Sequence, residues 1–147
     1  MAGTANESPL GSHELAPELQ ERLRATLGSY EELQLLLYAR RHPGPWFVPE
    51  AARTLHLDEP ALTEALGCLV HAGFLVTAGE GPLEARRFTY RPVSKALEEL
   101  TERLAEAVER DPLHVYETMN RHALERLRDS AARTFASAFV LGRKKDG

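Results

Sequence analysis

The sequence predicts a mostly helical α+β fold, in which several amphipathic helices accompany a single β-hairpin. Three observations predict it. Leucines recur at helical spacing in the first and last thirds of the chain. Two short β-prone runs flank a connection rich in glycine and proline, which is typical of a hairpin. Prolines and capping residues divide the intervening chain into short helices.

The N-terminal part contains two predicted helices. Residues 1–12 are small, polar and rich in glycine and proline, so we expect them to be poorly ordered. From Glu14 to Leu27, leucine recurs every fourth residue, which keeps these side chains on one helical face. Ser29 caps a second helix, Tyr30 to Arg41, and Glu32 completes a capping box.

The central part reads as two short helices joined by a tight turn. Residues 42–45 (HPGP) end the preceding helix, because two prolines and a glycine cannot continue it. Residues 46–48 then form a short extended piece, and Pro49 starts a helix that reaches about Leu55. Pro60 starts the next helix, which carries a buried stripe of leucines and ends at Gly73.

A hairpin and further helices complete the chain. Residues 74–77 and 87–91 are the two predicted strands. Ser94 caps a long amphipathic helix that the Asp111-Pro112 pair interrupts. Helical spacing continues to Leu127, and a last amphipathic piece covers residues 131–141 before a basic tail.

Residues 47–76, FVPEAARTLHLDEPALTEALGCLVHAGFLV, resemble the winged helix-turn-helix of MarR-like bacterial regulators. The second helix closes with a leucine, a glycine four residues later and two hydrophobic residues, which here are Leu69, Gly73, Phe74 and Leu75. The glycine lets the helix reverse into the first wing strand. The closing FASAFVLGRKK resembles the tail of small bacterial winged-helix proteins. We therefore expect an N-terminal segment and helix (1–28), a winged helix-turn-helix (29–92), and C-terminal dimerisation or docking helices with a basic tail (93–147).

The resemblance implies that duplex DNA is the partner and that the second helix of the motif enters its major groove. The candidate contact residues are Arg53, His56, Thr63, Glu64, Arg86, Arg87 and Arg91. That helix has no outward Arg or Lys, and residues 46–92 hold four basic against six acidic residues. Alternatively, the wing arginines are ion-pair partners of Glu80 or Glu84. For Arg53 and His56, the alternative is that they are solvated side chains on a helix surface.

The resemblance also implies that terminal helices pair two subunits. Our candidate homodimer residues are Leu15, Leu19, Leu23, Leu97, Leu100, Leu104, Val108, Phe135 and Phe139. An antiparallel helix pair within one chain is the alternative for the leucines. For the two phenylalanines, the alternatives are packing on the body of the same chain and docking of another protein.

Composition limits the remaining function classes. A chain of 147 residues suits one domain with a helical appendage, and its net charge of −4 excludes a wholly basic nucleic-acid binder. Cys68 is the only cysteine, so no disulfide forms within the chain. It is interpreted as an inert thiol rather than a redox sensor. We expect no membrane span or leader peptide, and hence a cytoplasmic protein.

The chemistry of an enzyme is not evident in the sequence. The six histidines lack metal-ligand spacing, and no glycine loop or nucleophile motif is present, so we expect no catalytic residue, metal or cofactor. Trp46, Phe47 and Tyr90 are interpreted as core side chains behind the wing rather than an effector pocket. Two hypotheses remain: a DNA-binding transcription regulator, and a winged-helix module that has lost DNA reading and binds a protein through its acidic motif helix or C-terminal helices.

Overall fold

The computed structural model describes residues 15–146, with side chains up to residue 138. The expectation for residues 1–12 therefore lies outside the described part of the chain. The helices are α3 (Pro17–Thr26), α4 (Tyr30–Arg41), α5 (Val48–Leu55), α6 (Glu59–Ala72), α7 (Lys95–Arg110) and α8 (Pro112–Asp146). Strands β1 (Leu75–Ala78) and β2 (Arg87–Tyr90) flank a short 3-10 turn, η1 (Leu83–Ala85).

Helix α4 lies at the centre of the molecule and packs against α5, α6, α7, α8 and β2. Its first turn forms as predicted, since Ser29 Oγ accepts a hydrogen bond from the Glu32 backbone N–H at 3.2 Å. The Glu32 carboxylate accepts in return from the backbone N–H of Gly28 at 3.0 Å. Residues 35–39 are all buried, so the middle of α4 is covered on every side. The other elements take their positions from this helix.

The predicted helix-turn-helix is formed by α5 and α6, which follow α4 and pack on it. His56 ends α5 in a left-handed conformation with a φ of 56°, and three residues later α6 begins. The apolar stripe of α6 faces α4, with Leu62, Leu66 and Leu69 fully buried. Gly73 ends α6 with a φ of 94°, which a side chain disfavours. The chain reverses there into β1, as the sequence predicts.

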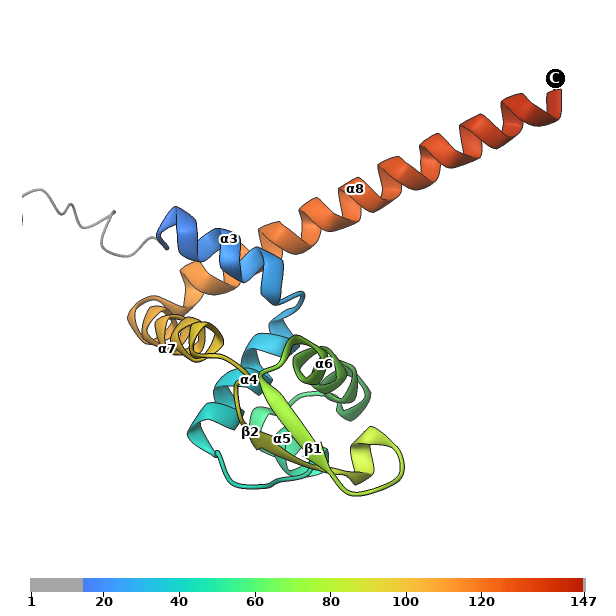
Figure 1. Cartoon of the computed structure of the whole chain (residues 1–147). Helices are drawn as coiled ribbons and strands as arrows, with labels where there is room; N and C mark the ends of the chain where they lie inside the picture. The colour runs from blue at the N-terminus through green and yellow to red at the C-terminus, as the bar shows by residue number, and fades with distance from the viewer. Residues whose placement is uncertain (1–14, 147) are drawn as a thin grey trace, which may run out of the picture.

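The wing is an antiparallel hairpin in which Leu75 pairs with Tyr90 and Ala78 with Arg87. Trp46 forms an antiparallel bridge to Phe88, with backbone hydrogen bonds of 3.1 and 2.8 Å. The chain before α5 therefore lies along β2, like a short third strand. Trp46 and Phe88 are buried. The helices, the tight turn and this hairpin confirm the mostly α-helical winged helix-turn-helix fold (Figure 1).

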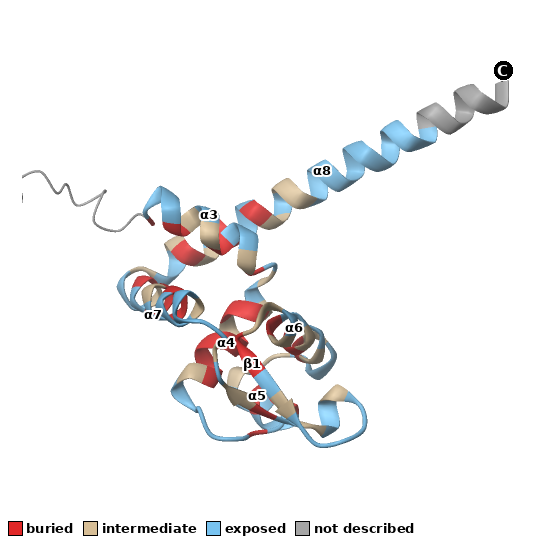
Figure 2. Cartoon of the chain, viewed as in Figure 1, coloured by how far each residue is buried: buried red, intermediate tan, exposed pale blue. Residues whose placement is uncertain are grey.

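The burial of Leu19 and Leu23 on α3, and of Leu15 just before it, differs from our expectation of a homodimer interface, because these leucines are covered within one chain (Figure 2). Leu15, Leu19 and Leu23 have at most 5% of their surface exposed. On α7, Leu100 and Leu104 are also buried, and Leu97 and Val108 are half-buried against the same core. The intramolecular alternative therefore describes these side chains. A second chain is not needed to cover them.

Helix α8 also differs from the prediction, since its 35 residues run unbroken through the place where a separate last piece was expected. Its first part packs on α3, α4 and α7, and Val115 and Met119 are buried there. Every residue from 127 to 138 is exposed, and this part projects away from the body (Figures 1 and 2). Phe135 lies on the projecting part, whereas the side chain of Phe139 lies outside the described ones.

Helix α7 is fixed to α4 by a two-point ion pair. Arg40 Nε and one terminal nitrogen donate to the two Glu102 oxygens at 2.7 and 2.6 Å. These contacts raise the pKa of Arg40 and lower the pKa of Glu102. No helix within residues 15–146 is long and apolar enough to span a membrane.

The burial of the α3 leucines can be tested by truncation. We expect Leu23→Ala to lower the free energy of unfolding by about 2–5 kcal/mol, because the substitution leaves a cavity in the core. Leu113→Ala, at an exposed site on α8, is the control and should change stability by about 0.5 kcal/mol or less. Urea unfolding at two protein concentrations measures both. A loss that disappears on dilution would instead place Leu23 in an interface between chains.

Candidate nucleic-acid interface

The surface of α6 that faces away from α4 is the first component of the candidate interface. Glu64 and His71 are exposed on it, and Thr63 is half-buried. The helix has no Lys or Arg, and the polar groups of its outward surface are a hydroxyl, a carboxylate, an imidazole and the exposed thiol of Cys68. Such a surface can accept hydrogen bonds from bases but cannot neutralise phosphate charge.

Both helix N-termini at this surface are closed by carboxylates of the chain itself. Glu50 Oε1 accepts from the backbone N–H of Phe47 at 3.1 Å, at the start of α5. Asp58 Oδ2 accepts from the backbone N–H of Ala61 at 3.4 Å, at the start of α6. Helix N-termini ordinarily attract phosphate through free N–H groups and the helix dipole. Here each terminus already carries a negative charge.

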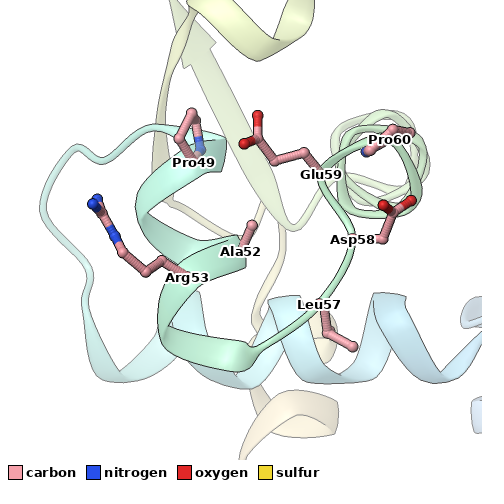
Figure 3. A pocket seen from close by; sticks show the side chains of 7 residues that line it. All are labelled: Pro49, Ala52, Arg53, Leu57, Asp58, Glu59 and Pro60. Atoms are coloured by element: carbon pink, nitrogen blue, oxygen red, sulfur yellow. The ribbon is translucent and has the colours of Figure 1, made fainter.

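A shallow groove lies between these two termini (Figure 3). Its volume is about 640 Å³, and residues of α5, the turn and the start of α6 line it: Pro49, Ala52, Arg53, Leu57, Asp58, Glu59 and Pro60. Arg53 brings the only cation of this lining, against the carboxylates of Asp58 and Glu59. The lining of this groove is therefore net acidic, which agrees with the excess of acidic over basic residues in the sequence of residues 46–92.

The wing supplies the cations that α6 lacks. Phe88 points into the core, so Arg87, its neighbour in β2, lies on the opposite, outer side of the strand, and Arg91 directly follows the end of β2. Both are exposed, and within residues 15–138 neither forms an ion pair or a side-chain hydrogen bond. Among the described residues, Arg87 and Arg91 are therefore not paired with Glu80 or Glu84, which was the alternative interpretation of the sequence.

Arg86 is held differently from its two neighbours. Its Nε donates to the backbone carbonyl of Gly81 at 2.8 Å, so the side chain braces the wing loop. Arg86 precedes β2 and is half-buried. Of the three wing arginines, Arg87 and Arg91 are therefore exposed without a side-chain partner among the described residues, whereas Arg86 is bound to the wing loop.

The wing loop packs back onto α6, which sequence reasoning missed. Leu83 of η1 reaches Gly67, and a Cβ at that glycine would lie 3.4 Å from Leu83 Cδ1. The turn η1 also packs on α5. Gly67 in the middle of a helix was the available signal, because glycine there often marks a close approach of another segment.

The aromatic side chains behind the wing are divided between core and surface. Trp46 packs edge-on against Tyr38, with ring centroids 5.2 Å apart, and Tyr90 is half-buried against the core. Phe47 is 39% exposed and lies at the N-cap of α5, so the prediction that it is a core side chain is wrong. Its position follows from α5, which begins one residue later and turns Val48 inward instead.

Cys68 lies on the flank of α6 beside two carboxylates. Burial is the main cause that raises the pKa of its thiol, and the charges of Glu32 and Glu64 raise it further. A raised pKa favours the unreactive thiol form. Among the described residues, no group of three or more His, Cys, Asp or Glu side chains is arranged to hold a metal ion.

Comparison with known proteins adds one similar solved structure. The chain resembles the adhesin competence repressor AdcR from Streptococcus pyogenes, with 16% sequence identity and a TM-score of 0.46. The match covers 83% of this chain and 89% of that chain. No protein-family model and no curated protein sequence matches the chain.

The carboxylates near Cys68 make its alkylation a probe of this flank. We expect iodoacetamide to react with Cys68 more slowly at pH 7 than with N-acetylcysteine, because less of the thiol is ionised. Glu64→Gln should raise the rate and move the pH–rate midpoint downward. Glu80→Gln, a change on the wing loop, is the matched control. Equal rates for the protein and the free thiol would contradict the assignment.

Proposed function

We propose that this chain is a DNA-binding transcription regulator of the winged-helix type that acts as a homodimer. The observation that carries the proposal is the wing that follows α6, where Arg87 and Arg91 are both exposed. The resemblance of residues 47–76 to MarR-like regulators supports the same function. In this mode α6 enters the major groove and the wing arginines contact phosphates or the minor groove.

The distribution of charge sets the character of this binding. Two wing arginines per chain neutralise about four phosphates in a dimer, which corresponds to a slope of log affinity against log salt of about −3.6. Arg53 and His56 on α5 are proposed as secondary contacts. Thr63 and Glu64 are proposed to face bases, where a carboxylate accepts a hydrogen bond from a cytosine amino group. Arg86 contributes through the shape of the wing loop.

The projecting part of α8 supports pairing of two chains. Leu127 and Phe135 of this part, and Leu124 just before it, are 66%, 73% and 50% exposed, and they recur at helical spacing. Most of the stability of a helix in a protein comes from tertiary packing of its amphipathic face, and residues 127–138 of α8 are all exposed. A second copy of α8 would cover these side chains and place two wings on one duplex. The proposed interface therefore shifts from the α3 and α7 leucines to the projecting part of α8, with Phe139 a further candidate on it.

The second candidate function is binding of another protein through the helix-turn-helix surface. The specific observation in its favour is the closure of both helix N-termini by Glu50 and Asp58. Those carboxylates repel phosphates but suit a partner with lysine or arginine side chains. The two candidate functions predict opposite results at low salt: the regulator binds duplex DNA, and the protein-binding module does not.

Removal of the wing cations tests the DNA-binding function. We expect the chain to bind random-sequence duplex at about 50 mM salt, and Arg87→Ala with Arg91→Ala to weaken binding by about tenfold or more. Fluorescence anisotropy over a salt series measures both affinity and slope. Arg103→Ala, on α7 and outside the interface, removes a similar charge and should leave the affinity unchanged.

The outcome separates the two candidate functions. Glu64→Gln should raise the affinity for random duplex, because it removes a charge that phosphates repel. Absence of duplex binding by the wild-type chain at low salt would overturn the regulator proposal and favour the protein-binding module.

Substitutions on α8 in the full chain test the proposed dimer. We expect the chain to elute near twice its mass of 16.4 kDa in size-exclusion chromatography with light scattering. Leu124→Ser with Leu127→Ser should shift it toward the monomer, because serine removes the apolar stripe. Leu113→Ser, an equally exposed change near the start of α8, is the control. A wild-type monomer at micromolar concentration would contradict the proposal.

A further inference from the structure

A pocket of about 320 Å³ lies where α3 packs on the first half of α8. Each helix presents a row of polar side chains to it, because residues three or four apart lie on one helical face. These side chains are Gln20, Glu21 and Arg24 of α3, with Arg121, His122 and Glu125 of α8. The lining contains no residue of the helix-turn-helix or the wing, so this pocket is separate from the candidate nucleic-acid interface.

Both signs of charge are present on each side of the pocket. Helix α3 contributes Glu21 and Arg24, and α8 contributes Arg121 and Glu125. Their spacing of three and four residues would allow each helix to form its own ion pair. Among the described residues, however, Glu21, Arg24 and Glu125 take part in no ion pair and no side-chain hydrogen bond. These three charged groups are therefore available to a ligand.

The fourth charged group is already held in position across the two helices. Arg121 donates a hydrogen bond to the Gln20 side-chain oxygen at 3.2 Å, and the Gln20 amide donates in turn to the Leu15 carbonyl at 3.0 Å. A guanidinium has five N–H donors, so Arg121 keeps donors for a further partner. Because this side chain is ordered before a ligand arrives, binding costs less conformational entropy.

His122 is an enclosed polar group in the wall of the same pocket. It has 6% of its surface exposed, and within the described part of the chain its ring forms no hydrogen bond. Burial lowers the pKa of its imidazole, so the ring is neutral at pH 7 and offers one N–H and one lone pair. Buried side-chain polar groups ordinarily have a hydrogen-bond partner. The unpartnered ring therefore indicates a polar ligand.

The charges of the lining define the chemistry of that ligand. A simple anion would be repelled by Glu21 and Glu125, and a simple cation by Arg24 and Arg121, so each would meet an unfavourable charge. A molecule with both a negative and a positive group can satisfy all four. The volume lies near the lower end of the range of about 300–1,000 Å³ for ligand pockets, which indicates a small molecule.

We propose that this pocket binds a small zwitterion that carries one carboxylate and one primary ammonium group, as a free amino acid does. The carboxylate binds the two arginines, the ammonium group binds the two glutamates, and His122 contributes one further hydrogen bond. The ligand joins α3 to α8 at a place where neither helix closes its own charges. The proposal is independent of what the winged surface binds, so its test stands apart from the test of DNA binding.

Four ligands with four carbons each test the charge requirement: 2-aminobutyrate, 4-aminobutyrate, butyrate and butylammonium. In two-dimensional amide and imidazole NMR of the full chain at pH 7, we expect at least one aminobutyrate to cause saturable shifts in α3, in the first half of α8 and in the His122 ring. Its dissociation constant should be about tenfold or more below those of butyrate and butylammonium, because each of these lacks one set of charge-assisted hydrogen bonds.

Variants of the two exposed charges of α3 assign the groups. Glu21→Gln should weaken aminobutyrate binding by about tenfold without weakening that of butyrate, and Arg24→Gln should do so without weakening that of butylammonium. Glu117→Gln and Arg128→Gln, exposed on α8 and outside the lining, are the matched controls and should leave the affinity unchanged. Neither Glu21 nor Arg24 has a partner to lose within the described residues, so we expect all four variants to fold.

Three results would overturn the proposal. The first is the absence of saturable shifts with either aminobutyrate up to about 10 mM, which is weaker than the affinity of a useful small-molecule site. The second is equal affinity for butyrate or butylammonium, which would show a site for a single charge. The third is a set of shifts that leaves the His122 ring unchanged, which would show ion pairing at the exposed side chains only.

Discussion

The burial of the middle of α4 on all sides is the constraint on which the rest of the structure depends. A run of consecutive buried residues, 35–39, faces α6 on one side and the α7–α8 layer on the other. Each neighbour removes part of this apolar surface from water, which is the main favourable contribution to folding. The wing and the helix-turn-helix are therefore placed by contacts to the same helix that α7 and α8 contact.

The candidate interface divides its chemistry between two elements. The helix-turn-helix presents carboxylates at both of its N-termini, and the cations stand on β2 and directly after it. Affinity for a polyanion must then come from the hairpin, while α6 contributes hydrogen-bonding groups without phosphate contacts. In the proposed complex with DNA, such a surface would contact phosphates through fewer charges than a basic recognition helix provides.

The two halves of α8 have different environments. Its first half is enclosed by α3, α4 and α7, with His122 and Met119 inside the contact. Its second half extends into solvent with apolar side chains exposed. The first half packs on the body of the molecule, and the second half continues the same straight helix away from it (Figure 1).

Much of the local structure followed from the sequence. The capped helix from Tyr30 to Arg41, the reversal at Gly73 and the pairing of the two β-prone runs each depend on residues close together in the chain, where capping and backbone preferences act. The shortage of cations on α6 was also evident, because helical periodicity identifies its outward positions.

Contacts between distant segments could not be read from the same patterns. The leucine stripes of α3 and α7 fit a dimer and an intramolecular pair equally well, since periodicity identifies an apolar face but not what covers it. The Leu83–Gly67 contact and the burial of His122 under α3 likewise join residues far apart in sequence. The sequence by itself determined which segments fold and which faces are apolar, and only the tertiary structure decided which faces meet, because that choice depends on the packing of the whole chain.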